Sequence, residues 1–437
     1  MLFSPPHCDV LTPEYVDLST NVGGIVSPNP FWLASAPPTN SAYQVCKAFE
    51  QGWGGAVWKT LTNSPIVNVS SRYGALHYKQ HRMMGFNNIE LISEKTVAQN
   101  CQEMAEVKQR FPKHAVVASL MFEEKEAWQE AVKQCEAVGV DGFELNFGCP
   151  HGMCERGMGS TIGQNPELVE RITGWVKVVA TKPVLVKLTP NITDITVAAL
   201  AAKACGADGV SLINTINSVM GVDLNTLSPL PSVRGYSSHG GYCGPAVKPI
   251  ALHHVSQIAQ HPELQGLPIS GIGGIETWQD VAEFLALGAS GIQVATAAMH
   301  YGFKLVQEME HGLRQYLHAQ GMHSVQQLVG QAVPRIQRWE ALDLNYAVKA
   351  HINADTCIGC QLCYVACDEG AHQAIALPNE GRIPNIIEEA CVGCNLCSHV
   401  CPVEACITMV PTAESNTAPY LPWSEHPKNT RSACSAS

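Results

Sequence analysis

The chain has 437 residues, more than an ordinary single domain, and 38 Asp and Glu against 27 Lys and Arg give it a formal net charge of −11. Because such a chain repels phosphates overall, it is a poor candidate for sequence-independent binding of RNA or DNA. The sequence lacks both a long uncharged apolar run and a basic, apolar N-terminal leader, so we expect a cytoplasmic protein that does not engage a membrane.

The first 320 residues alternate short, β-rich apolar runs with amphipathic segments, a pattern typical of parallel strands joined by crossover helices. We count eight such strand and helix units. This number favours an α/β TIM (β/α)8 barrel over an open doubly wound sheet, and we assign residues 1–320 to it. The expected strands are 31–37, 55–61, 115–121, 142–148, 183–188, 209–215, 268–274 and 291–297.

The rest of the chain divides into three segments. Residues 321–350 are expected to form a helical linker, and residues 351–411 a small α+β module of the ferredoxin type. Residues 412–437 are rich in Pro, Ser, Thr and Asn, which predicts a mobile tail. Cys434, within this tail, is interpreted as an unconstrained surface thiol.

The ferredoxin-like module contains nine of the eighteen cysteines, in a segment that runs from Cys357 to Cys406. Two runs, CIGCQLCYVAC and CVGCNLCSHVCP, space them by two, two and three residues. This is the spacing of bacterial two-cluster ferredoxins, in which the fourth cysteine of each run binds the cluster of the other. We therefore expect two 4Fe-4S clusters, one held by Cys357, Cys360, Cys363 and Cys401 and the other by Cys391, Cys394, Cys397 and Cys367.

Zinc is the alternative metal for this module. It would need only pairs of cysteine pairs and would leave thiols over, so iron-sulfur clusters are favoured. Asp368 replaces the proline expected after the fourth cysteine of the first run, a change that affects packing or potential rather than ligation. Cys406 lies outside both sets and is expected to be a small buried apolar residue.

Because such clusters carry single electrons, the barrel is expected to hold a group that also exchanges electron pairs with a substrate, as a flavin does. Functional side chains of TIM barrels lie at the C-terminal ends of the strands. The glycines and backbone amides of SGIGGIE and QVATAAM match the phosphate site of such barrels, which predicts flavin mononucleotide, FMN. The residues at the strand ends are Ser35, Lys59, Thr60, Asn146, Cys149, Lys187, Asn214, Thr215, Gly273, Gly274, Ala295 and Thr296.

The two lysines at strand ends have two interpretations. Lys187 and Lys59 can each place a cation near the pyrimidine edge of the flavin ring and so stabilise its anionic reduced form. Alternatively, each lysine only closes an ion pair within the barrel.

Several stretches resemble the dihydropyrimidine dehydrogenase family, most closely the separate pyrimidine-reducing subunit of its bacterial NAD-dependent members. They are FNNIELISEKT (86–96), ELNFGCPHGMCERGMG (144–159), VKLTPNITDI (186–195), INT (213–215) and the two ferredoxin runs. The resemblance covers nearly the whole chain except the tail. It implies an FMN barrel that interconverts uracil or thymine with the 5,6-dihydropyrimidine.

Carried over by position, the resemblance also implies residue roles. Cys149 is then the acid/base, and Asn88, Asn146, Asn214 and Thr215 contact the substrate. The implied FMN contacts are Ser35, Lys59, Thr60, Lys187, Gly241, Gly273, Gly274, Ala295 and Thr296. Two departures are visible: Gly148 stands where the family often has a serine, which puts one substrate hydrogen bond in question, and Cys154 stands where it often has glycine.

The chemistry of these residue types agrees with the implied roles. An asparagine amide offers a donor and an acceptor side by side and can read the edge of uracil without a charge, although any single asparagine can equally satisfy local backbone. Cys149 can protonate carbon 5 of the ring after hydride reaches carbon 6, and can take the proton back in the reverse reaction. Glycines at 152, 157, 159 and 163 would let its loop open and close. Inert packing is the alternative for Cys149, and Cys154 is a competing candidate.

No G-x-G-x-x-G follows a predicted strand, so NAD(H) is expected to bind elsewhere. The resemblance implies a partner subunit with FAD and NAD(H), in a hetero-oligomer that we expect to be a heterotetramer. A dihydroorotate dehydrogenase-like enzyme, a non-catalytic electron-transfer subunit and a flavin-dependent RNA-modifying barrel are the alternatives. Orotate, unlike uracil, would require a dedicated cation for its carboxylate.

Overall fold

The computed structural model describes residues 16–78, 81–150, 152, 157–415 and 417–429. The chain divides into two compact units, Met1–Arg335 and Ile336–Ser437. Residues Cys154 and Cys434 lie outside the described part of the chain.

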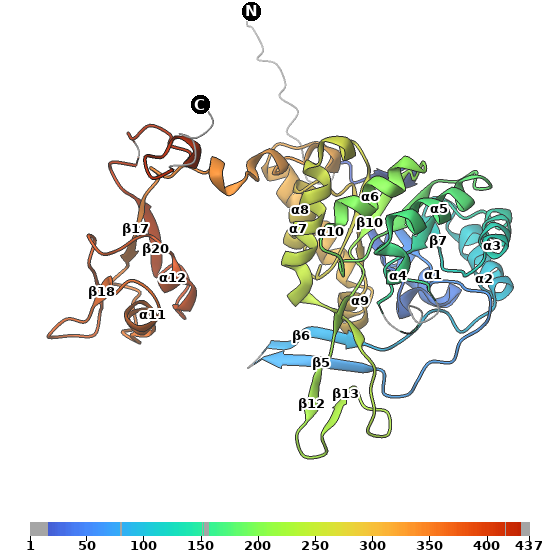
Figure 1. Ribbon diagram of the computed structural model, residues 1–437, viewed down its shortest axis with the longest axis horizontal. Helices are drawn as coiled ribbons and strands as arrows, with labels where there is room; N and C mark the ends of the chain where they lie inside the picture. Colours follow the sequence, from blue (N-terminus) through green and yellow to red (C-terminus); the bar gives the residue numbers. More distant parts are fainter. Residues whose placement is uncertain (1–15, 79–80, 151, 153–156, 416, 430–437) are drawn as a thin grey trace, which may run out of the picture. The chain divides into compact units, whose positions relative to one another are not determined.

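The first unit is a closed barrel of eight parallel strands, and the TIM fold expected from the sequence is confirmed (Figure 1). Around the barrel the strands follow the order β10-β15-β16-β3-β4-β7-β8-β9. Each strand begins within the range expected from the sequence and ends before that range does. The strands are β3 (Phe31–Leu33), β4 (Gly55–Val57), β7 (Ala115–Leu120), β8 (Gly142–Asn146), β9 (Val184–Lys187), β10 (Gly209–Leu212), β15 (Ile269–Ile272) and β16 (Gly291–Val294).

Helices cover the outside of the barrel, and their sequences explain where they begin. Thr96 and Thr277 each start a helix with a capping box, and Asn165 caps a helix whose first residue is Pro166. The apolar side of each helix faces the strands; Val169, Ile172 and Val176 of α5 are examples. The helices are α1 (Ala42–Phe49), α2 (Val97–Arg110), α3 (Lys125–Ala137), α4 (Ser160–Gly163), α5 (Pro166–Lys177), α6 (Ile195–Ala204), α7 (Lys248–Gln260), α8 (Trp278–Ala286), α9 (Thr296–Tyr301) and α10 (Leu305–Ala319).

An apolar cluster fills the N-terminal end of the barrel. The hairpin of β1 (Thr20–Val22) and β2 (Ile25–Ser27) packs Val22 and Ile25 there, in contact range of the first residues of two strands, Gly291 and Gly142. The buried members are Val22, Ile25, Trp32, Val57, Ala115, Val117 and Leu185. Because apolar side chains fill this end, the polar groups that bind a ligand are expected at the opposite, C-terminal end of the barrel.

A four-stranded antiparallel sheet, which the sequence did not predict, lies at the C-terminal ends of the strands. Its order is β11-β14-β6-β5, and it joins segments far apart in the chain, because Asn88 pairs with Gly241. A hairpin of β12 (Gly221–Asp223) and β13 (Ser228–Leu230) projects beyond it (Figure 1). The sheet strands are β5 (Tyr73–Tyr78), β6 (His81–Asn88), β11 (Ile216–Ser218) and β14 (Gly240–Cys243).

The second unit is the ferredoxin-like domain. Each cysteine run turns through a positive-φ glycine, Gly359 or Gly393, and then through Gln361 or Asn395 in the left-handed region before a short helix begins. The elements are β17 (Val348–Ile352), α11 (Leu362–Gly370), β18 (Ile375–Ala376), β19 (Asn385–Ile386), α12 (Leu396–Val400) and β20 (Ile407–Pro411). The two cysteine runs therefore share the same local backbone conformation.

The linker and the tail differ from expectation. Residues 321–350 contain three 3-10 helices and no α-helix, and the first part belongs to the barrel unit, where Val325 is buried. In the tail, the backbone N–H of Leu421 donates to Asp343 Oδ1 at 3.0 Å, and the Trp339 and Trp423 rings lie 5.8 Å apart. The described part of the tail thus packs within its own unit, and residues 430–437 lie outside the described part.

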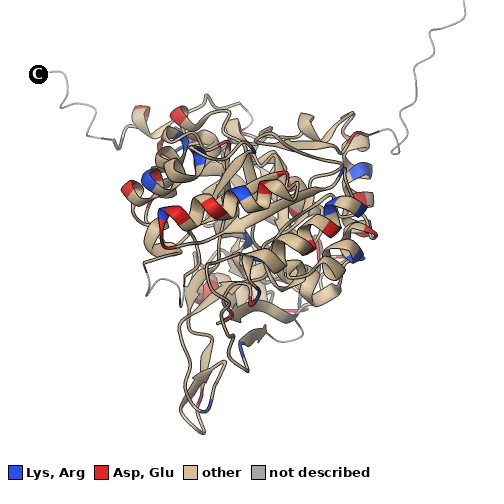
Figure 2. Ribbon diagram, turned by 90° about the vertical axis from the view of Figure 1, so that its right-hand side faces the viewer, with Lys and Arg blue, Asp and Glu red and all other residues tan. Residues whose placement is uncertain are grey.

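In the view of Figure 2, acidic and basic residues are interspersed along the outer helices. None of the helices among the described residues is long and apolar enough to cross a bilayer.

Candidate active site

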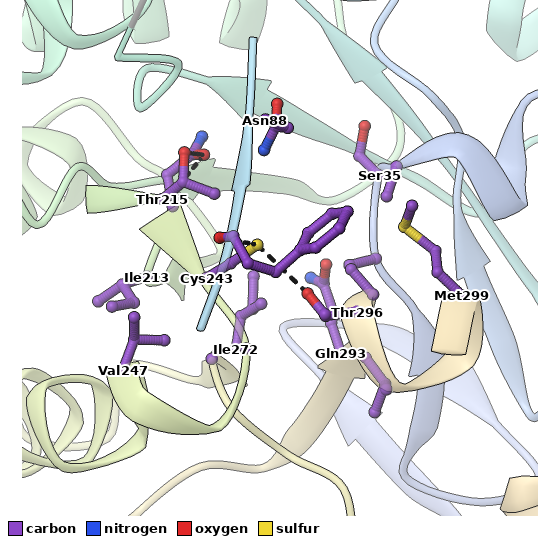
Figure 3. Close-up of a pocket in the computed structure, with 18 of the residues that line it drawn as sticks. Ser35, Asn88, Ile213, Thr215, Cys243, Val247, Ile272, Gln293, Thr296 and Met299 are labelled. Carbon is purple, nitrogen blue, oxygen red and sulfur yellow. Dashed lines mark hydrogen bonds between the residues drawn. The ribbon is translucent and has the colours of Figure 1, made fainter. Parts of the chain in front are cut away.

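A cavity opens at the C-terminal ends of the barrel strands and has an internal space of about 1170 Å³, counted with the solvent at its mouth. It collects all the barrel residues expected at the site except one, Gly241, which lies in β14 and accepts from Asn88 Nδ2 at 3.2 Å through its carbonyl. The expected residues that line it are Ser35, Lys59, Thr60, Asn88, Asn146, Cys149, Lys187, Asn214, Thr215, Gly273, Gly274, Ala295 and Thr296. Figure 3 shows part of this lining.

A chain of hydrogen bonds connects the polar residues on one side of the cavity. Asn146 Nδ2 donates to Thr60 Oγ1 at 3.0 Å, Asn214 Nδ2 donates to Asn146 Oδ1 at 2.9 Å, and the Thr215 N–H donates to Asn214 Oδ1 at 2.8 Å. Both amide oxygens are therefore engaged, and the orientation of each amide is fixed. Each of the two amide nitrogens keeps a second N–H that no described residue accepts, and a ligand with carbonyl oxygens can use it.

Both lysines of the cavity are buried and lie next to carboxylates. Lys59 forms an ion pair with Glu90, which also accepts from the Tyr73 hydroxyl. Lys187 Nζ lies 3.5 Å from Glu144 Oε1. The ion-pair interpretation of the lysines therefore applies to both of them, without removing either from the cavity lining. Glu90 was missed as a site residue although it stands in the FNNIELISEKT motif, because its partner is 31 residues away in the chain.

Cys149 follows β8, lines the cavity and is 8% exposed. Its carbonyl accepts from the Ser160 N–H at 2.9 Å, where the loop returns to the barrel. Gly159 has φ +60°, and a Cβ there would lie 2.4 Å from the Cys149 carbonyl oxygen. Only glycine suits this close approach, so the returning loop fixes the backbone that carries the thiol.

Gly148, where the family often has serine, packs directly against Asn214. A Cβ at Gly148 would lie 2.5 Å from Asn214 Cβ and 2.7 Å from its Nδ2. The space of the missing side chain is thus used by Asn214, which reaches Asn146 as a result.

Cys243 is a cavity residue that the sequence reasoning missed. Its Sγ accepts from Thr296 Oγ1 at 3.3 Å and donates to the Phe86 carbonyl at 3.3 Å (Figure 3). Burial raises the pKa of the Cys243 thiol to about 11, against a smaller lowering by the Thr296 hydrogen bond. The cavity therefore holds a second, neutral thiol, and the GGYCGP stretch next to Gly241 was the available signal.

The raised pKa of Cys243 has a measurable consequence for stability. The unfolded thiol loses its proton first as pH rises, so the free energy of unfolding falls between about pH 9 and the folded-state pKa of about 11. Over this interval the free energy of unfolding of the wild type should fall by up to about 2 kcal/mol more than that of Cys243→Ser. Chemical denaturation of both proteins at pH 8 and pH 10.5 measures it, and parallel pH profiles would contradict the assignment.

In the second unit, two cavities are each lined by four of the eight expected ligands. One contains Cys357, Cys360, Cys363 and Cys401, and the other Cys367, Cys391, Cys394 and Cys397. The fourth cysteine of each run thus lies with the first three of the other, as in two-cluster ferredoxins. Cys406 lines the first cavity and its Sγ lies 3.8 Å from the Asn353 carbonyl oxygen.

These cavities fit a cluster better than a single ion. Among the described residues, no three His, Cys, Asp or Glu side chains converge closely enough to hold one metal ion. Burial raises the pKa of Cys363 to about 11 and raises that of Cys397, so these thiols would become thiolates at neutral pH only with a cationic metal centre bound to them. An N–H···S bond of 3.3 Å from Ala374 to Cys367 adds a donor of the kind that tunes cluster potentials.

Comparison with known proteins agrees with both units. Residues 17–317 match the family described as dihydroorotate dehydrogenase, and residues 350–409 match the 4Fe-4S dicluster domain. The NAD-dependent dihydropyrimidine dehydrogenase subunit PreA of Escherichia coli K12 is 46% identical over 394 residues, which cover 90% of this chain and 95% of that protein.

Two further relatives match a smaller share of this chain. The chloroplastic dihydropyrimidine dehydrogenase (NADP(+)) of Arabidopsis thaliana is 40% identical over 328 residues, 72% of this chain and 77% of that protein. The catalytic subunit of dihydroorotate dehydrogenase B (NAD(+)) from Pyrococcus furiosus is 37% identical over 317 residues, 71% of this chain and 96% of that protein. The chain therefore belongs to the dihydroorotate dehydrogenase family of FMN barrels, and within it to the dihydropyrimidine dehydrogenases that carry a 4Fe-4S dicluster domain.

Proposed function

We propose that this chain interconverts uracil or thymine with the 5,6-dihydropyrimidine, with Cys149 as the acid/base. The observation that carries the proposal is one cavity in which a buried thiol, an oriented pair of asparagine amides and two lysines meet. The names of the Escherichia coli and Arabidopsis relatives support the same reaction.

The polar groups of the cavity suit an uncharged pyrimidine. The remaining N–H groups of Asn146 and Asn214 can donate to ring carbonyl oxygens, and the Asn88 side chain can complete the ring edge. Lys59 and Lys187 already have Glu90 and Glu144 as counter-charges. Because both lysines are paired with carboxylates and would face the flavin ring, neither supplies a separate cation for a substrate carboxylate. The cavity therefore favours uracil over orotate, which would bury an uncompensated negative charge.

FMN fits the same cavity. The glycines Gly273 and Gly274 have positive φ angles and leave the backbone accessible at the ends of β15, beside Ala295 and Thr296. When bound there, FMN would supply or accept the hydride at carbon 6 of the pyrimidine. Cys149 Sγ would then hold the proton that is delivered to carbon 5, and take it back in the oxidative direction. Lys187 and Lys59 would hold positive charge close to the flavin ring.

Anaerobic mixing of the purified protein with dihydrouracil tests the proposal. Bleaching of the flavin absorbance is expected, and an unchanged spectrum would favour a non-catalytic electron-transfer subunit.

The dihydroorotate alternative rests on the Pyrococcus relative. Orotate should fail to compete with uracil in equilibrium binding, whereas strong competition would reject the charge argument above.

The electron partner is proposed to be a separate subunit with FAD and NAD(H), in a heterotetramer. The Escherichia coli relative is named as a subunit of an NAD-dependent enzyme, and the ferredoxin-like unit offers two cluster cavities as an electron path. Co-expression followed by size-exclusion chromatography tests this pairing, and a chain active with NADH alone would contradict it.

Gly148 gives a prediction about substrate affinity. Gly148→Ala should displace Asn214 and raise KM for uracil roughly tenfold, about 1.4 kcal/mol of binding free energy, with a smaller change in kcat. Gly174→Ala is the matched control, since a Cβ there meets no atom within 4 Å. Steady-state kinetics of the three proteins measure the effect. An unchanged KM in Gly148→Ala would show that Asn214 does not depend on this contact.

A further inference from the structure

A carboxylate lies inside the barrel, directly below the cavity. Glu144 of β8 is 0% exposed, at a level where the interior of such barrels is usually filled by Val, Ile and Leu. The level beneath it follows that rule, with Val57, Val117 and Leu185 in the apolar end cluster. A buried ionised carboxylate is costly unless it is paired and hydrogen-bonded, so the contacts of Glu144 require an explanation.

Three other strands contact this side chain directly, and a fourth does so through Gln293. Its Oε2 accepts from Ser211 Oγ of β10 at 2.7 Å and from Gln293 Nε2 of β16 at 2.8 Å. Gln293 Nε2 is also 3.1 Å from Ser270 Oγ of β15. Glu144 Oε1 has no hydrogen-bond partner among the described residues and faces Lys187 Nζ of β9 at 3.5 Å. One carboxylate oxygen is thus anchored to the barrel, and the other is left for the lysine.

Lys187 occupies the boundary between this buried level and the cavity. It is 5% exposed, lines the cavity and has Glu144 as its ion-pair partner in the described structure. The 3.5 Å separation is longer than a tight charge-assisted hydrogen bond of about 2.8 Å, so the ammonium retains donors for a ligand above it. Gln293, which also lines the cavity in Figure 3, holds Glu144 from the side.

We infer that Glu144 is a positioning residue that holds the Lys187 ammonium at the cavity floor and sets how much positive charge it presents to FMN. The inference rests on FMN occupying this cavity, which the flavin content of each purified protein tests separately. A counter-charge that faces the lysine from below weakens its attraction for an anionic reduced flavin. Removing that counter-charge should therefore favour the reduced form.

The first test is the midpoint potential of bound FMN in an anaerobic redox titration. Glu144→Gln should shift the reduction equilibrium at least tenfold toward the reduced flavin, about 30 mV for a two-electron couple. Ser211→Ala, which removes a hydrogen bond to Glu144 but no charge, should leave the potential near that of the wild type. Lys187→Met should lower the potential, and Glu144→Gln should then add little. The inference would be overturned if Glu144→Gln shifted the midpoint potential equally in the presence and absence of Lys187. It would also be overturned if Ser211→Ala shifted the potential as much as Glu144→Gln does.

The second test uses the flavin-free protein and does not depend on catalysis or potential. Lys187→Met leaves the Glu144 carboxylate without its cation, and should lower the melting temperature. Adding Glu144→Gln should recover part of the loss, since the unpaired buried charge is then gone. If the two substitutions lowered the melting temperature additively in the double variant, the pairing of Glu144 with Lys187 would be overturned. If the protein binds FMN and passes both tests but does not oxidise dihydrouracil, the proposed function fails while this inference stands.

Discussion

Replacing Cys149 by alanine should leave FMN bound and lower turnover of dihydrouracil by about a hundredfold or more, the usual contribution of a positioned general acid/base. The thiol lines the cavity at the end of β8, and its backbone is held by Ser160 and Gly159. Loss of the sulfur removes the proton carrier without disturbing the asparagine pair. Stopped-flow flavin reduction and steady-state turnover, on protein of measured FMN content, give the size of the effect.

Two variants sharpen this experiment. Cys205→Ala removes a half-buried thiol outside the cavity lining and should keep wild-type turnover. Cys243→Ser keeps a donor beside Thr296 and should also oxidise dihydrouracil. The Cys243 thiol has a raised pKa and is neutral in the working pH range, so it is a poor acceptor for the substrate proton. Near-normal turnover in Cys149→Ala would assign the proton transfer to another group.

Replacing Cys363 by alanine should remove one cluster, so that the iron content falls from about eight to about four atoms per chain. NAD-coupled turnover in the complex with the partner subunit should fall to background. Reduction of FMN by dihydrouracil within the chain should persist, because it needs only the barrel. Iron and sulfide analysis, electron paramagnetic resonance and anaerobic flavin spectra separate these effects.

Cys406→Ala is the matched control for the cluster experiment. Cys406 lines the same cavity as Cys363 and is 2% exposed, but its Sγ lies beside the Asn353 carbonyl and it stands outside the ferredoxin spacing. This variant should keep both clusters. Iron loss from Cys406→Ala equal to that from Cys363→Ala would mean that the spacing rule misassigns a ligand.

The barrel could be predicted from sequence because its strands are continuous apolar runs flanked by amphipathic helices. All eight strands were located, but each ends earlier than expected, since the residues after Leu33, Val57 or Ile272 turn to line the cavity. The sheet of β5, β6, β11 and β14 was missed because it depends on nonlocal pairs such as Asn88 with Gly241. Hydrophobic periodicity carries no information on such pairing.

The residues that line the cavity were predicted to the extent that they stand at strand ends. Glu90, Glu144, Cys243 and Gln293 were not singled out, because their importance comes from partners on other strands. Glu144 did leave a sign in the sequence: it is a charged residue at the third position of the expected strand GFELNFG, and its side chain points to the same face as that of Asn146. A charge at an inward position of a barrel strand requires a counter-charge, and Lys187 supplies it.

The exchange of fourth cysteines between the two runs makes the metal centres interdependent. Cys401 completes the set begun by Cys357, and Cys367 completes the set begun by Cys391. Neither run contains all four cysteines of a set, so a cut in the chain between the runs would divide the ligands of both sets, whereas loss of one cysteine affects only one set. Both runs must therefore lie in one continuous domain for either centre to form.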